Sequence, residues 1–233
     1  MNHVRASFAT MFIANQLRPK LLAAVFATVT GVLGGCALTD KPVRAAVFDF
    51  GPGELSAAAT PPSGGTLAPL ALAELEAASA LDSTAVVYRL QYDNVQQLRP
   101  YAQARWSMPP AQLVRQRLRA HLSLQRAVLN PGEGVLSVAA PKAGSAETGA
   151  RLLRVELEEF SQVFESTTHS VGLVRLRATL VRPTAAGEQL VAQREFALQR
   201  PAPSADAAGG VRALTLATDA AVQALGQWLR QLP

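Results

Sequence analysis

The chain has 233 residues, one cysteine and a formal net charge of +5. A single cysteine excludes an intramolecular disulfide, so the hydrophobic core alone must hold the fold. Three basic residues and no acidic residue precede position 36, so the remainder carries 22 − 3 = 19 basic and 17 acidic side chains, a net charge of +2. This small excess does not indicate a nucleic-acid-binding protein, whose basic residues would cluster.

The only cysteine follows an amino-terminal segment with the features of a secretory signal. Arg18 and Lys20 precede twelve uncharged residues, and two glycines stand directly before Cys36. A basic region, an apolar region of about 7–15 residues and small residues at the end are typical of signal peptides, whereas a transmembrane helix needs about 20 apolar residues. The arrangement resembles a bacterial lipoprotein signal, which implies cleavage after Gly35 and lipid on Cys36. A free structural cysteine is the alternative.

The expected organisation is a signal peptide over residues 1–35, a lipidated tether over 36–42 and one α+β domain over 43–233. Met1 and Met11 are both candidate start sites, and either leaves the signal intact. The extended tether spans about 20 Å, which keeps the domain close to the membrane. Because Ala37 rather than an aspartate follows Cys36, resemblance to known sorting signals implies the periplasmic face of the outer membrane.

The first half of the domain alternates extended segments with structure breakers. We expect three strands here, at residues 43–50, 85–90 and 98–106. Residues 67–76 are ambiguous, because alanine and leucine favour a helix whereas Pro69 and alternating leucines favour a strand. A turn over residues 92–94 joins the second and third strands into a hairpin. Ala104 shares a strand face with Trp106, so we expect Trp106 to lie in the core.

The second half begins with a helix and continues mainly as strands. Apolar residues recur at intervals of three and four over residues 111–122, as in an amphipathic helix. We expect further strands at residues 134–139, 151–164, 174–180 and 190–198 and a final helix over 211–232. The inward positions change parity near Glu158, which predicts a β-bulge. The predicted fold class is α+β, with a mostly antiparallel sheet of about seven or eight strands packed with two main helices, preceded by the signal peptide.

No combination of residues indicates catalysis. After the signal peptide only His121 and His169 remain, and neither belongs to a nucleophile, metal or phosphate-binding motif. His121 suits the boundary of a helix, and His169 suits a hairpin turn. The three glutamates between residues 156 and 159 lack accompanying ligands and are typical of a solvated strand face. We therefore expect a protein that is not an enzyme and that uses no cofactor or metal.

Arginines are concentrated in one stretch of the chain. Between Asp93 and Glu133 there are six arginines and no acidic residue. Arg115 and Arg119 stand one helical turn apart, which places them on the same side of the helix. They either make the outer side of a packed helix soluble or form an interaction face for anionic lipid or an acidic partner.

A spaced set of residues resembles a known family. The set is Leu81, Asp82, Tyr88, Arg89, Tyr101, Arg105, Trp106 and Pro109. Together with the leucine-rich helix that follows, it resembles the auxiliary lipoproteins of MCE-type ABC transporters. The resemblance implies a non-enzymatic partner of an MCE substrate-binding protein, a permease and an ATPase that together move lipids between the inner and outer membranes.

Two interpretations of function follow from these patterns. The first is the transport auxiliary that the family resemblance implies. The second is an outer-membrane assembly or structural lipoprotein that binds protein partners without a role in transport. Both require the lipid anchor, and a homo-oligomer is compatible with either.

Overall fold

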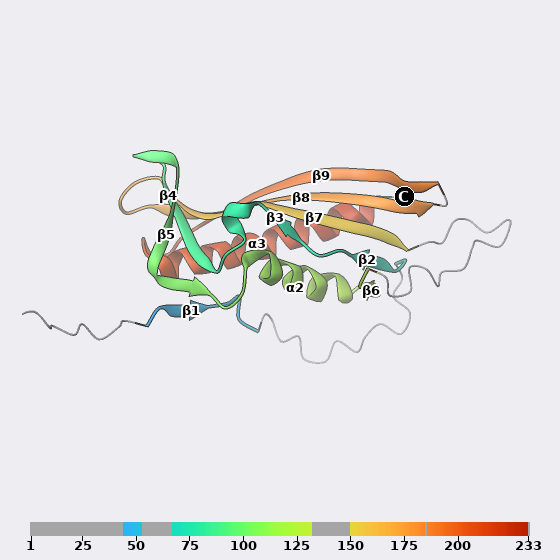
Figure 1. Ribbon diagram of the computed structural model, residues 1–233, viewed down its shortest axis with the longest axis horizontal. Helices are drawn as coiled ribbons and strands as arrows, with labels where there is room; N and C mark the ends of the chain where they lie inside the picture. Colours follow the sequence, from blue (N-terminus) through green and yellow to red (C-terminus); the bar gives the residue numbers. More distant parts are fainter. Residues whose placement is uncertain (1–43, 53–66, 132–149, 185, 233) are drawn as a thin grey trace, which may run out of the picture. The chain divides into compact units, whose positions relative to one another are not determined.

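The computed structural model describes residues 44–52, 67–131, 150–184 and 186–232 (Figure 1). Its sheet is built on β7 (Arg151–Phe164), which pairs antiparallel with β8 (Ser170–Thr184). Strand β8 pairs in turn with β9 (Gly187–Pro201), again antiparallel. The three strands form a meander in which residues with inward side chains alternate with polar residues, as expected when one face of a sheet is packed.

The other edge of β7 is occupied by a run of short parallel strands. They are β2 (Leu70–Leu72), β3 (Glu76–Ala77) and β4 (Ala85–Leu90). The three follow one another along the edge of β7, so Leu70, Glu76 and Tyr88 align with successive parts of that strand. Residues 67–76, ambiguous by composition, therefore contribute β2 and the first residue of β3 rather than a helix.

Three further strands extend the sheet. Strand β5 (Asn94–Trp106) pairs antiparallel with β4 through a tight turn, as predicted. Strand β1 (Ala46–Phe48) lies parallel to the end of β5, and β6 (Val128–Leu129) lies parallel to β2. The described residues thus form a nine-stranded mixed sheet. The expectation of a mostly antiparallel sheet with fewer strands was wrong, because side-chain alternation does not specify which strand edge a segment joins.

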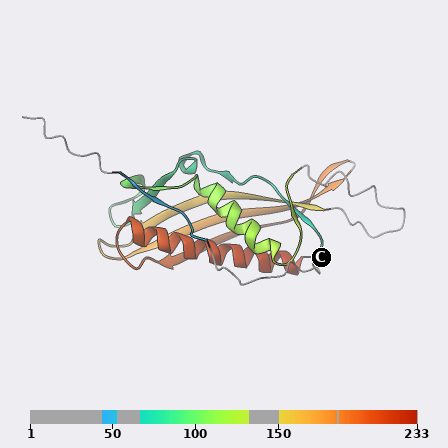
Figure 2. The ribbon, with the colours of Figure 1, turned by 90° about the horizontal axis from the view of Figure 1, so that it is seen from below.

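Two α-helices cover one face of the sheet among the described residues (Figure 2). Helix α2 (Pro110–Ser123) begins after Pro109, where a proline in the first turn removes no hydrogen bond. Helix α3 (Ala207–Gln231) begins at Asp206, whose carboxylate accepts a hydrogen bond from the Gly209 amide at 2.7 Å. A short 3-10 turn, η1 (Ser79–Leu81), connects β3 to β4.

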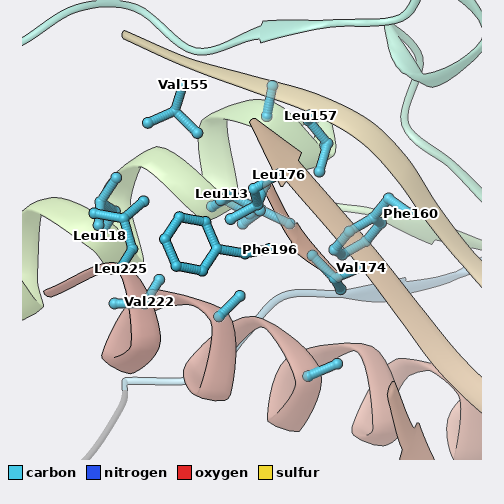
Figure 3. Packing of buried hydrophobic residues seen from close by; sticks show 14 of the residues in the cluster. Leu113, Leu118, Val155, Leu157, Phe160, Val174, Leu176, Phe196, Val222 and Leu225 are labelled. Carbon is cyan, nitrogen blue, oxygen red and sulfur yellow. The ribbon is translucent and has the colours of Figure 1, made fainter. Parts of the chain in front are cut away.

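The core lies between the sheet and the two helices (Figure 3). Leu157, Leu176 and Phe196 come from neighbouring strands, and Leu118 and Leu225 come from α2 and α3. Residues 153, 155 and 157 are buried as alternation predicts, and the β7–β8 register shifts between Leu157 and Glu159. The predicted β-bulge is confirmed.

Some predictions fall on residues that the structure does not describe. They concern the signal peptide that ends at Gly35, the tether that begins at Cys36, and the strand at residues 134–139. Within the described ranges, no helix combines the length and apolar character needed to cross a membrane.

Candidate functional site

Two tyrosines of the resemblance set meet on the inner side of the β4–β5 hairpin. The rings of Tyr88 and Tyr101 have centroids 4.6 Å apart. The Tyr101 hydroxyl donates a hydrogen bond to Gln162 Oε1 at 2.8 Å, and Gln162 Nε2 donates to Ser170 Oγ at 2.7 Å. Gln162 is completely buried. These four residues, here called the tyrosine–glutamine cluster, connect β4, β5, β7 and β8 around the buried Gln162 side chain.

The amino-terminal turn of α3 closes this cluster. A Cβ on Gly210 would overlap the Gln162 side chain, so the helix approaches closely only because this position is glycine. Hydrogen bonds from Gly209 and Ser204 lower the pKa of Asp206 at the start of the helix. Burial raises the pKa of Tyr101, and the charges of Tyr88 and Asp206 add to the effect, so the phenol stays protonated and acts as a donor.

Replacement of Tyr101 by phenylalanine should destabilise the domain by about 1–3 kcal/mol, because Gln162 Oε1 would lose its donor in a buried site. Tyr88→Phe is the matched control, since it removes a hydroxyl from the neighbouring ring. We expect a smaller loss from it in the free energy of unfolding, measured with urea. Equal losses in the two variants would contradict the assigned role of the Tyr101–Gln162 hydrogen bond.

Arg89 and Arg105 lie away from this cluster. Arg89 forms an ion pair with Glu159 at 3.0 Å and donates to the backbone carbonyls of Val95 and Gln96. It therefore ties the tip of the β4–β5 hairpin to the side of β7. Arg105 is exposed on β5 and pairs in register with Val47, which is 59% exposed.

The other members of the set have structural positions. Trp106 is 1% exposed and packs edge-on against Phe50 and Phe160, which confirms its predicted place in the core. Leu81 is buried in the same core, and Asp82 caps the end of η1. Pro109 is the cap residue before α2. The set thus marks two different environments rather than one catalytic centre.

The structure engages Arg115 and Arg119 in contacts within the domain. Arg115 forms an ion pair with Glu74 at 3.0 Å and donates to the Ala73 carbonyl. Arg119 donates to the Val128 carbonyl at 2.9 Å, and both arginines donate to Asn130 Oδ1. They attach α2 to β6 and to the segment between β2 and β3. Both arginines therefore contribute contacts that hold the domain together.

Combined Arg115→Glu and Arg119→Glu substitutions should lower the free energy of unfolding by about 2 kcal/mol or more, because hydrogen bonds from charged groups would be replaced by carboxylates facing carbonyls. Arg105→Glu with Arg194→Glu is the matched control, since both of these arginines are exposed. Urea unfolding measures both pairs of substitutions. A loss no larger than in the control would show that these contacts contribute nothing to stability.

The titratable residues form ion pairs and packing contacts. Glu158 and Glu156 pair with Arg177, while Glu159 pairs with Arg89. Burial lowers the pKa of His121, and Arg230 adds to that effect. His169 lies in an exposed turn, where its Nδ1 is 2.9 Å from Thr168 Oγ1. Across the described ranges no group of three His, Cys, Asp or Glu residues is arranged to hold a metal ion.

Sequence reasoning missed Gln162, Ser170 and Gly210. Two signals were available in the sequence: the glutamine side chain near the largely apolar end of β7, and two adjacent glycines in the first turn of α3. Both are unfavourable locally and point to a contact elsewhere in the fold. Which residue supplied that contact depended on the pairing of the strands.

Comparison with known proteins identifies the group to which this architecture belongs. The sequence model of the ABC-type transport auxiliary lipoprotein component family matches residues 53–226. The chain belongs to this family. The match spans the β4–β5 hairpin, both α-helices up to residue 226 and the complete β7–β9 meander. No curated protein sequence matches the chain.

Solved structures show the same fold. A Xanthomonas campestris protein of the family DUF330 is 20% identical, with a TM-score of 0.57, and the match covers 72% of this chain and 87% of that one. An uncharacterized protein is 14% identical with a TM-score of 0.55, covering 80% and 99% of the two chains. At these identities the likeness concerns the fold alone. The auxiliary lipoprotein therefore has an architecture already seen in other proteins.

Proposed function

We propose that this auxiliary lipoprotein is a non-enzymatic component of an MCE-type ABC transporter that moves lipids between the inner and outer membranes. The observation that carries the proposal is the family match over residues 53–226. The tyrosine–glutamine cluster links three strands through hydrogen bonds, and we infer a structural role for it rather than a catalytic one. Arg89 and Arg177 form ion pairs with glutamates of β7.

The position of β1 supports a membrane-proximal location. The strand begins at Ala46, ten residues after Cys36. Ten extended residues reach at most about 35 Å. With lipid on Cys36, this strand and the end of β5 beside it would stay close to the membrane surface. We assign the anchor to the outer membrane, facing the periplasm, because Ala37 follows the cysteine.

The tip of the β4–β5 hairpin is the surface that we propose contacts the MCE protein. In Figure 1 the turn end of this hairpin extends away from the helices. Tyr92 and Val95 at the tip are 49% and 48% exposed. Arg89 donates to the carbonyls of Val95 and Gln96, which holds the backbone of the strand that carries Val95. A rigid apolar anchor is typical of an interface hot spot.

Capture of the MCE protein by the full-length lipoprotein tests the function and the surface together. Interface hot spots contribute about 2 kcal/mol or more, so Tyr92→Asp with Val95→Asp should reduce capture about tenfold or more. Leu190→Asp with Leu216→Asp is the matched control, since these leucines are 62% and 54% exposed elsewhere. Full capture by the tip variant would exclude this surface. No capture by the wild type, with recovery of outer-membrane assembly proteins instead, would favour the structural lipoprotein.

Replacement of Cys36 by alanine should abolish lipidation. The cysteine is the only thiol in the chain, and it follows two small residues and an uncharged run. Metabolic labelling with palmitate should mark the wild type and not the variant, and the wild type should fractionate with the outer membrane. Labelled protein in the Cys36→Ala variant would contradict the attachment site. Recovery of the wild type with inner membranes would contradict the assigned membrane.

A further inference from the structure

A small cavity lies where the last turn of α3 meets the start of β2 and the far end of β8. Its volume is about 150 Å³. Leucines form its apolar part: Leu180 and Leu229 are 2% and 5% exposed, and Leu67 and Leu232 lie at its border, where they are partly exposed. The cavity is remote in sequence from the β4–β5 hairpin and shares no residue with the tyrosine–glutamine cluster.

Three arginines line the same cavity, and no acidic residue does. They are Arg126, Arg151 and Arg230. Arg230 donates to Gln125 Oε1, a neutral acceptor, at 3.0 Å. Within residues 44–52, 67–131, 150–184 and 186–232, no ion pair joins Arg126 or Arg151 to a carboxylate. Among the described residues, seven other arginines form ion pairs with carboxylates.

The three guanidinium groups act on one another. Burial lowers the pKa of Arg126, and the charges of Arg151 and Arg230 lower it further. Three cations around one apolar cavity repel each other unless an anion is placed between them. The carboxyl end of α3 carries only a partial negative charge, about half an elementary charge, which cannot neutralise all three. The site is therefore electrostatically suited to a fully charged anion.

The combination of charge and apolar surface restricts the class of ligand. Guanidinium groups bind phosphate and carboxylate oxygens in paired hydrogen bonds. The leucine side chains cannot form hydrogen bonds, so they favour a ligand in which a hydrocarbon chain is attached to the anionic group. A volume of about 150 Å³ equals roughly five water molecules, which is enough for a head group and the first carbons but not for a whole lipid. The remaining chain would lie outward, along Leu67 and Leu232.

We propose that this cavity binds the anionic head group, phosphate or carboxylate, of an amphiphile whose apolar chain begins against the leucines. The proposal does not rest on the transport role, since it concerns only the contents of the cavity. Arg126 and Arg151 contact the head group from the two sides of β2, and Arg230 completes the positive surround from α3. These three side chains are binding residues.

Photo-crosslinking in membranes tests the proposal on the full-length lipidated protein. Phosphatidylcholine proteoliposomes receive trace photoactivatable lysophosphatidic acid, or a photoactivatable monoacylglycerol with the same chain and no charge. We expect crosslinks on the peptides that contain Leu67 and Leu229 with the anionic probe, and about tenfold fewer with the neutral one. Equal labelling by both probes would overturn the proposal.

Substitutions identify the arginines that bind the anionic group of the probe. Arg126→Gln with Arg151→Gln should reduce crosslinking about tenfold or more. Arg175→Gln with Arg194→Gln removes the same charge from exposed positions and should leave it unchanged. Thermal melting verifies folding, and the exposed Arg230→Gln variant repeats the test if the double variant does not fold. Undiminished crosslinking in a folded Arg126 and Arg151 double variant would overturn the site.

Competition with inorganic phosphate separates the two sources of the anion. Phosphate alone should displace lysophosphatidic acid only at far higher concentrations, because it lacks contacts with the leucines. Displacement at concentrations similar to those of the lipid would overturn the amphiphile and assign the cavity to a free anion.

Discussion

Replacement of Trp106 by alanine is expected to destabilise the domain by about 3–5 kcal/mol, the usual cost of removing a buried tryptophan. Trp106 is 1% exposed. The centroid of its ring lies 5.7 Å from that of Phe50 and 5.5 Å from that of Phe160, and both pairs of rings meet edge-on. The cavity left by the indole would lie where β1, β5 and β7 converge. The surrounding backbone is held by strand pairing, so the cavity cannot collapse without breaking hydrogen bonds.

Thermal and urea unfolding of the domain measure this loss. Tyr92→Ala is the matched control, because it also truncates a large aromatic side chain but at a position that is 49% exposed. Surface truncations of this kind change the free energy of unfolding by about 0.5 kcal/mol or less. Similar melting temperatures for Trp106→Ala and the wild type would mean that the indole is exposed in solution, and would make it a candidate for partner contact.

Gly172→Ala should be similarly damaging for a different reason. A Cβ on residue 172 would lie 2.5 Å from the Leu214 backbone nitrogen and 2.6 Å from the Ala213 carbonyl carbon. Both are main-chain atoms of α3, so no side-chain rotation relieves the overlap. The helix would have to move away from β8 and loosen its packing against the sheet. We expect a loss of about 3 kcal/mol or more, at or above the usual range for overpacking.

Gly51→Ala is the control that distinguishes steric overlap, expected in Gly172→Ala, from the loss of glycine's backbone freedom. Gly51 has φ +66 and nothing within 4 Å of an added Cβ, so its replacement costs only backbone strain. That strain is about 1–2 kcal/mol for a residue in the left-handed region. Urea unfolding should therefore rank Gly172→Ala as the more destabilising of two identical chemical changes. The reverse ranking would contradict the close approach of α3 to β8.

The sequence by itself determined the local elements. Apolar spacing predicted α2 and α3, because a helix that packs on one side must repeat its apolar residues at intervals of three and four. Alternation predicted β7 over its full length, and the change of parity near Glu158 predicted its bulge. The burial of Trp106 followed from the strand face that it shares with Ala104. Each of these properties depends on neighbours along the chain, so it can be predicted from a local sequence pattern.

Only the tertiary structure decided which segments meet. Strands pair through backbone hydrogen bonds, which do not depend on the identity of the side chains. The alternation of apolar and polar residues therefore could not predict that β2, β3 and β4 lie parallel along β7. That alignment places Tyr101 against Gln162 and brings Arg126, Arg151 and Arg230 to one cavity. It also turns Arg115 and Arg119, predicted as a surface pair, into links to Asn130. Long-range pairing sets the partners of polar side chains, and those partners decide whether a charge is structural or available for binding.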